Sequence, residues 1–161
     1  MLDARYLSPA GVTPDAARRL LDWLLARGAD EFTVAVMALG GEPARVADAF
    51  EDALAPYELP VASRRVPSGA VGAAPTRDVR RWALTVESLT ELLAFLPRGL
   101  FDAQPGPSGW LEDIAVYRRG ELLLGVVTHE REGVLRLTPA EHREVEALGV
   151  TSSPTGESIH Y

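Results

Sequence analysis

The sequence predicts an α+β fold, in which a mainly antiparallel sheet of about five to six strands packs against four helices. Helical patterns and short apolar runs follow one another in the order α-β-α-β-β-α-β-β-β-α, which is not a regular βαβ alternation. The last third of the chain contains three short apolar runs separated by turn residues, which is typical of an antiparallel meander. The length of 161 residues is that of one domain, and no internal repeat is visible.

The first predicted element is a helix from about Pro14 to Arg27. Thr13 can cap its first turn, and proline suits the first helical position. Gly28 follows the last turn, where a left-handed residue is commonly needed. Apolar residues recur at spacings of three and four and form one stripe, which consists of Ala17, Leu20, Leu21, Leu24 and Leu25.

A strand and a second helix follow. The length and valine content of Phe32–Leu39 predict a strand that is apolar on both faces and therefore central in the sheet. Gly40-Gly41 ends this strand. A helix then runs from Pro43 to about Ala55, where Pro56 stops it.

The middle of the chain predicts two more strands and a short helix. The strands are expected near Leu59–Val66 and Arg80–Val86, and the segment between them, rich in Gly, Ala and Pro, is expected to be a loop. Ser88 and Glu91 form a capping box for a helix at about Leu89–Leu96. A second Pro- and Gly-rich loop follows this helix.

The C-terminal third predicts the meander and the last helix. Thr138 and Glu141 form a capping box for a helix that runs to about Leu148. The polar stretch Thr151–Tyr161 predicts a tail-like extension of the single domain. The meander consists of strands at Leu111–Tyr117, Leu122–Thr128 and Val134–Leu137, with turns at Arg119-Gly120 and Arg131–Gly133.

Composition limits the functional classes. With 16 basic and 23 acidic side chains the formal net charge is −7, which argues against nucleic acid as a partner, because phosphate affinity comes mainly from Lys and Arg. The absence of cysteine excludes disulfide scaffolds, zinc fingers and thiol catalysis. No apolar run approaches the roughly 20 residues that span a bilayer. We therefore expect a soluble, cytoplasmic protein with no membrane partner and no cofactor.

A polar cluster on the meander is the sharpest chemical candidate. A two-residue hairpin at Arg119-Gly120 places Trp110, Glu112 and His129 on one face of the sheet, and Glu130 follows in the next turn. An imidazole beside carboxylates can bind a divalent metal or share acid–base chemistry. This pattern predicts His129, Glu112 and Glu130 as catalytic residues, or His129 and Glu112 as metal ligands. The other interpretation is a half-buried imidazole stacked on an indole.

Positive charge is concentrated in one segment. Val61–Arg81 contains five arginines and one aspartate, whereas the rest of the chain is strongly acidic. Arginine makes bidentate contacts to carboxylate or phosphate, and a basic edge on an acidic body can steer a charged partner. The candidate binding residues are Arg64, Arg65, Arg80 and Arg81. Alternatively, these arginines flank edge strands and protect them from aggregation.

Two aromatic residues bracket the second Pro- and Gly-rich loop. If Phe101 and Trp110 are exposed, they are candidate anchors of a protein interface, because large rings carry much of the binding energy in protein contacts. If they are buried, they hold the long loop against the core. The sequence leaves both interpretations open.

These patterns support three functional hypotheses. The leading one is a small, acidic, non-enzymatic bacterial interaction module, such as an inhibitor or an immunity-type protein, with a basic protein partner. It is based on the small size, the acidic body, the aromatic residues beside long loops and the lack of a complete catalytic motif. One alternative is a small metal- or acid/base-dependent enzyme centred on His129. The other is a domain that senses an anionic ligand through its arginine-rich segment.

Overall fold

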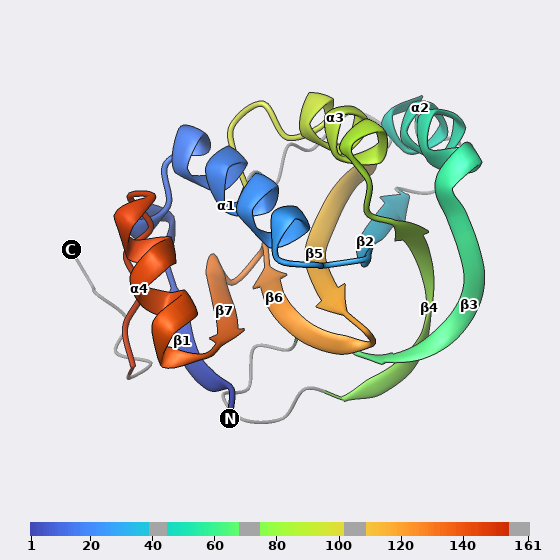
Figure 1. Cartoon of the computed structure of the whole chain (residues 1–161). Helices are drawn as coiled ribbons and strands as arrows, with labels where there is room; N and C mark the ends of the chain where they lie inside the picture. The colour runs from blue at the N-terminus through green and yellow to red at the C-terminus, as the bar shows by residue number, and fades with distance from the viewer. Residues whose placement is uncertain (39–44, 68–74, 102–108, 155–161) are drawn as a thin grey trace.

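The computed structural model describes residues 1–38, 45–67, 75–101 and 109–154, without the side chains at 37, 38, 45–47, 109 and 110 (Figure 1). Two short 3-10 helices lie at Pro9–Gly11 and Ala55–Tyr57. The other elements are β1 (Asp3–Leu7), α1 (Pro14–Ala26), β2 (Glu31–Ala38), α2 (Arg45–Leu54), β3 (Glu58–Arg65), β4 (Thr76–Ala83), α3 (Val86–Ala94), β5 (Gly109–Arg118), β6 (Glu121–Val127), β7 (Glu132–Leu137) and α4 (Pro139–Ala147).

The predicted α+β fold is confirmed, and the sheet has seven strands rather than five or six. The strand order is β1-β7-β6-β5-β2-β4-β3, and every neighbouring pair is antiparallel. β2 lies between β5 and β4, as its apolar sequence predicts. The additional strand is β1, which pairs with β7 at one edge of the sheet. Its sequence carries no apolar alternation, and only Leu7 is buried, so no pattern indicates a strand there.

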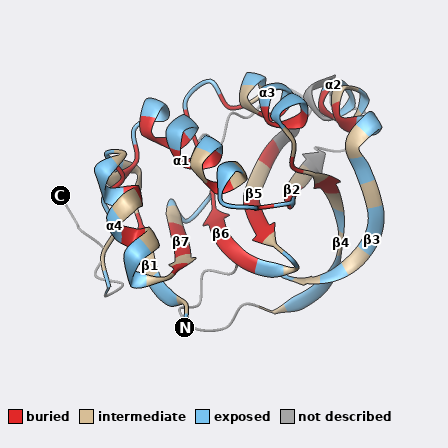
Figure 2. Ribbon diagram, viewed as in Figure 1, coloured by how far each residue is buried: buried red, intermediate tan, exposed pale blue. Residues whose placement is uncertain are grey.

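The helices cover one side of the sheet. Figure 1 shows α1, α2 and α3 above the strands, with α4 beside α1 near β1 and β7. Leu20, Leu21 and Leu24 of α1 are fully buried in the main core, and β6 is buried along nearly its whole length (Figure 2). The ring of Trp82 stacks on Phe32 at a centroid distance of 5.8 Å. In the described ranges, no helix has the length and apolarity to cross a membrane.

The helix α3 begins earlier than the sequence predicts. The predicted strand Arg80–Val86 is wrong at both ends, because β4 begins at Thr76 and ends at Ala83, and Val86 is already helical. The predicted capping box of Ser88 and Glu91 is also wrong. Thr85 is the N-cap instead: its hydroxyl accepts from the Ser88 N–H at 3.1 Å, and the Ser88 hydroxyl accepts from the Thr85 N–H at 2.9 Å.

The C-terminal meander and α4 follow the prediction closely. The turn at Arg119 and Gly120 has φ values of 53° and 79°, as a tight hairpin turn requires. The capping box of Thr138 and Glu141 is present at the start of α4. The second turn lies earlier than predicted, at residues 128–131, because Glu132 already pairs with Val127.

Several predictions, including the end of the first predicted strand at Leu39 and Gly40-Gly41, fall partly or wholly outside the described residues. The start of the second helix at Pro43 lies outside them, as do residues 68–74 and 102–108 of the two predicted loops. Of the predicted tail, residues 151–154 are described. Ser153 forms an antiparallel bridge with Tyr6, with N–O distances of 2.8 and 3.0 Å, which holds this part of the chain against β1.

The sheet splits between β2 and β4. Their ladder contains two residue pairs, Glu31 with Ala83 and Phe32 with Trp82. Beyond these pairs β4 and β3 curve away, and the end of β3 approaches β5 and β6 (Figure 1). The Tyr117 hydroxyl donates to the Arg65 carbonyl at 2.7 Å, which fixes this return of β3.

Candidate functional site

A cavity of about 680 Å³ lies where β2 and β4 separate. This volume is within the range of about 300–1,000 Å³ that is usual for ligand pockets. We call this cavity the β2–β4 cleft. Its described lining consists of residues 33–36 of β2, residues 77–80 and Trp82 of β4, Asp48 and Glu51 of α2, and Val66, Pro67 and Asp113.

Two strand edges face each other across the β2–β4 cleft. β2 pairs with β5 on one side as far as Ala38, but within the described residues its ladder with β4 ends at Phe32. β4 pairs with β3 on its other side. Residues 33–36 and 77–80 therefore present backbone N–H and C=O groups that lack a ladder partner on the cleft side among the described strands. Such edges are templates for an added strand.

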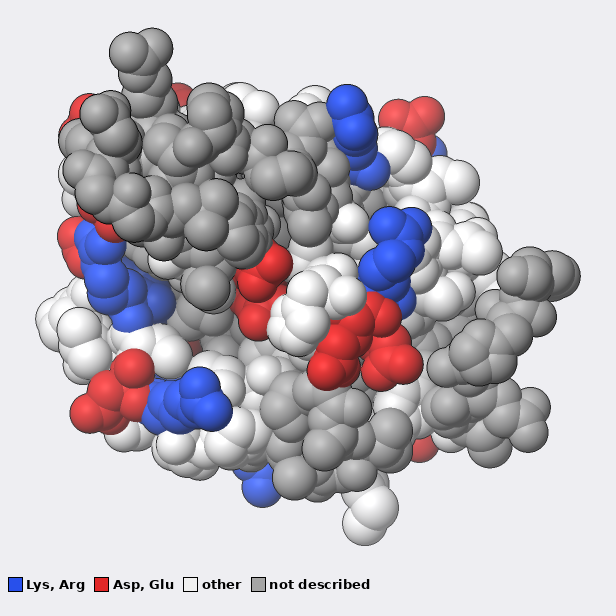
Figure 3. Space-filling view, turned by 180° about the vertical axis from the view of Figure 1, so that it is seen from behind, with Lys and Arg blue, Asp and Glu red and all other residues white. Residues whose placement is uncertain are grey.

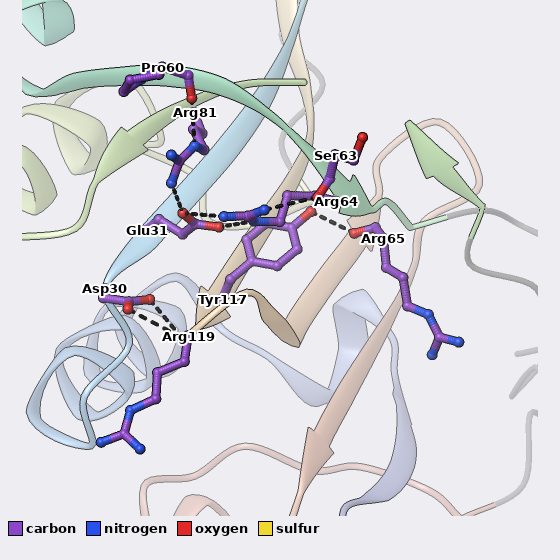
Figure 4. A network of polar contacts seen from close by, with 9 residues as sticks. All are labelled: Asp30, Glu31, Pro60, Ser63, Arg64, Arg65, Arg81, Tyr117 and Arg119. Carbon is purple, nitrogen blue, oxygen red and sulfur yellow. Dashed lines mark hydrogen bonds and ion pairs between the residues drawn. The ribbon is translucent and has the colours of Figure 1, made fainter. Parts of the chain in front are cut away.

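Glu31 holds the closed end of the cleft (Figure 4). Its side chain is 5% exposed and accepts hydrogen bonds from Arg64 of β3 and Arg81 of β4, with an Arg64 Nη2–Oε2 distance of 3.1 Å. Burial opposes ionisation of Glu31, but the two guanidinium groups outweigh it and lower the pKa of this carboxyl. The ionised carboxylate therefore joins three strands at the point where the sheet begins to split.

The arginines that the sequence predicts as binding residues are mostly paired inside the fold. Arg64 and Arg81 share Glu31, and Arg80 pairs with Glu51 at 2.5 Å and Glu58 at 2.9 Å. Figure 3 likewise shows basic side chains next to acidic ones across the rear face. The side chain of Arg65 is different, because it has no partner among the described residues. The arginine-rich segment is thus not a free basic edge.

The lining of the β2–β4 cleft is acidic and apolar. Among the described residues, four carboxylates line it, against the two guanidinium groups of Arg77 and Arg80. Trp82 is 1% exposed, and its buried Nε1 has no hydrogen-bond partner in the part of the chain that the structure describes. A buried polar group without a partner is rare in native structures and calls for an explanation. The carboxylates are those of Asp48, Glu51, Asp78 and Asp113.

The predicted polar cluster on the meander assembles in part. Nδ1 of His129 lies 3.9 Å from Oε2 of Glu112, and its Nε2 lies 3.8 Å from Oε1 of Glu130. The imidazole is 60% exposed and the Glu112 side chain 11%. The side chain of Trp110 lies outside the described residues, so its predicted stacking on His129 has no structural account.

The strand pairing that brings these residues together differs from the pairing of a regular two-residue hairpin. The pairing is as predicted next to the turn, where Tyr117 faces Leu122, but an irregularity then shifts it by one residue, so that Val116 faces Leu124. A second irregularity in β5 lies opposite Val34 of β2, between the pairs Thr33–Ala115 and Ala35–Glu112. A regular two-residue hairpin makes Trp110 face His129, and this register is therefore wrong.

The second irregularity adds Asp113 to the cluster. Leu111 and Ile114 both belong to the main core, so the two residues between them, Glu112 and Asp113, both lie on the opposite side of the sheet. Asp113 has a φ of +52°. Its N–H donates to the Thr128 hydroxyl at 3.0 Å, and its Oδ1 accepts from the Thr128 N–H at 2.9 Å. Strict alternation of side chains does not predict this placement.

Phe101 does not lie in an exposed interface. It is 8% exposed, and its ring packs against Gly133: a Cβ atom placed on that glycine would lie 3.4 Å from Cζ of Phe101. It therefore holds the end of its segment against the core. For Trp110 the structure gives the backbone position, which pairs with Met37 of β2.

No family model matches this chain. Searches of curated proteins and of solved structures likewise give no significant match. A functional proposal therefore depends on the β2–β4 cleft and the polar cluster themselves.

Proposed function

We propose that the protein is a small, non-enzymatic interaction module that binds an extended, basic segment of a partner protein in the β2–β4 cleft. The observation that carries this proposal is the early end of the β2–β4 ladder, which leaves two facing strand edges across a cavity of about 680 Å³. We propose an inhibitor or immunity-type role in the cytoplasm for this module.

Main-chain hydrogen bonds provide the affinity in this mode of binding. Four residues of β2 line the cleft, which corresponds to about 13 Å of strand at about 3.3 Å per residue. An extended peptide can pair with this edge, with the facing edge of β4, or with both. The Glu31 ion pairs hold one end of the cleft closed, so the edges are kept in place before the partner arrives.

Charge and side-chain chemistry favour a basic segment with apolar residues at alternate positions. The acidic lining attracts Lys and Arg, whereas Val34, Val36 and Val79 provide apolar walls for the alternate side chains. An anion-sensing role is not favoured, because the guanidinium groups of Arg64, Arg80 and Arg81 are already paired.

Selection from a displayed library of random octapeptides tests this proposal. We expect enrichment of peptides with net positive charge and alternating apolar residues. Asp48→Arg reverses a charge in the lining of the cleft and should weaken binding of the selected peptide by at least about tenfold. Asp52→Arg is the matched control, because this exposed aspartate lies on the same helix but not in the lining.

Two results would contradict the proposal. One is a selection that enriches no peptide above the background of the library. The other is an equal loss of affinity in the Asp48 and Asp52 variants, which would indicate general attraction to the acidic surface rather than binding in the cleft.

A further inference from the structure

We infer that Glu112, Asp113 and His129 form a binding site for a divalent transition-metal ion, with zinc as the expected metal. One ligand atom from each of the three side chains lies within 4.8 Å of the other two. Around an ion at about 2.1 Å, neighbouring ligand atoms are roughly 3–3.5 Å apart. Small rotations of these side chains therefore bring the three groups to binding distance. This inference does not depend on peptide binding in the β2–β4 cleft, although Asp113 belongs to both sites.

The irregularity in β5 is what makes the site possible. In a regular strand Glu112 and Asp113 point to opposite faces, and one of the carboxylates enters the core. Leu111 and Ile114 occupy the core instead, so both carboxylates lie on the side of His129. Irregularities of this kind commonly redirect side chains next to functional sites.

The Glu112 carboxylate needs a cation. Its side chain is 11% exposed, and in the described part of the chain no group donates a hydrogen bond to it. Its nearest charge partner is Nδ1 of His129 at 3.9 Å, which exceeds hydrogen-bond length. A carboxylate that is largely removed from water is normally paired or bound to a metal.

The other two ligands are oriented by groups around them. The Thr128 N–H holds Oδ1 of Asp113 at 2.9 Å, which leaves Oδ2 available to an ion. Glu130 lies 3.8 Å from Nε2 of His129, where it can orient the ring while Nδ1 faces the ion. Outer partners of this kind commonly fix metal-ligating side chains.

The three metal-binding side chains favour zinc over magnesium and calcium. One imidazole and two carboxylates suit zinc and related transition metals, whereas magnesium and calcium prefer a shell of oxygen atoms alone. Three protein ligands also leave at least one coordination position open. Because Asp113 lines the β2–β4 cleft as well, the bound ion would lie at the rim of that cavity.

Calorimetric titration of the full chain with zinc chloride, after treatment with a chelator, tests this site. All proteins carry His160→Ala, so that this imidazole adds no zinc binding, and the remaining histidine, His142, is fully buried. We expect one zinc ion per chain and a dissociation constant at least about tenfold weaker in His129→Ala and Glu112→Gln. Glu121→Gln, on the same hairpin, is the control and should leave affinity unchanged. Magnesium chloride should give much weaker binding.

The absence of saturable zinc binding overturns the inference, and so does unchanged affinity in either His129→Ala or Glu112→Gln. If a variant is unfolded by circular dichroism, X-ray absorption of the zinc complex of the otherwise native chain decides. One imidazole nitrogen in the zinc shell supports the site, and a shell of oxygen atoms alone contradicts it.

Discussion

Arg64 and Glu31 form a bidentate ion pair although their strands, β3 and β2, are separated in the sheet by β4. The contact is possible because β3 curves back so that its end approaches β6, which brings the Arg64 side chain against Glu31 (Figure 4). The pair therefore fixes the curvature that opens the β2–β4 cleft. Its removal should affect stability more than the removal of an ordinary surface pair.

Glu31→Gln should lower the free energy of unfolding by about 3 kcal/mol, because it leaves Arg64 and Arg81 partly buried without their counter-charge. Urea denaturation measures this loss. The control is Glu58→Gln, which removes a half-exposed partner of Arg80 and should cost no more than about 1 kcal/mol. Equal losses in the two variants would show that Glu31 has no special role in the fold.

Tyr117→Phe should release the end of β3. The hydroxyl is buried, and burial raises the pKa of this phenol, so it remains protonated and donates to the Arg65 carbonyl. The loss of this bond should cost about 1 kcal/mol and speed exchange of the Arg65 and Val66 amides. Exchange that increases equally in β7, at the far side of the sheet, would contradict a local effect.

Glu141 should contribute to stability in a pH-dependent way. Burial raises the pKa of its carboxyl, but hydrogen bonds from the Thr138 backbone and from Arg118 outweigh burial and lower the pKa to about 2. Because the folded pKa lies below the ordinary value of 4.5, the stabilisation is complete above pH 4.5 and is lost as the pH falls towards 2.

Glu141→Gln should therefore destabilise the protein at pH 7 by up to about 3 kcal/mol and have little effect near pH 2. Thermal unfolding at a series of pH values measures this difference. A destabilisation that stays constant from pH 7 to pH 2 would mean that the charge of Glu141 is not responsible.

Thr85→Ala should destabilise the protein by about 1 kcal/mol, because the hydroxyl caps the first turn of α3. Glu91→Ala tests the capping box predicted from the sequence and should have a smaller effect, since Thr85 and not Ser88 is the N-cap. Chemical denaturation compares the two variants. A larger loss in the Glu91 variant would favour the predicted cap.

The parts of the fold that local chemistry specifies are predictable from the sequence. Thr13, Pro14 and Gly28 mark the ends of α1 within a residue or two, and Thr138 with Glu141 marks the start of α4. The apolar run of β2 predicts its place between two other strands. In each case the signal consists of neighbouring residues and needs no knowledge of the rest of the fold.

The features of the candidate sites depend on contacts between distant segments, so the sequence does not show them. Glu31 begins a strand and resembles a surface carboxylate until Arg64 and Arg81 are brought against it. Asp113 joins Glu112 because β5 contains an irregularity, and side-chain alternation predicts the opposite. The strand β1 depends on backbone pairing with β7, from the other end of the chain.

Hydrogen–deuterium exchange of residues 33–36 and 77–80, with and without a selected basic octapeptide, tests the proposed strand addition most directly. If the peptide pairs with the free edge of β2 or β4, cleft-side amides in 33–36 or 77–80 should become protected, while β7 stays unchanged. Peptide binding that leaves both segments as exposed to exchange as before would place the partner elsewhere and contradict a role for the β2–β4 cleft.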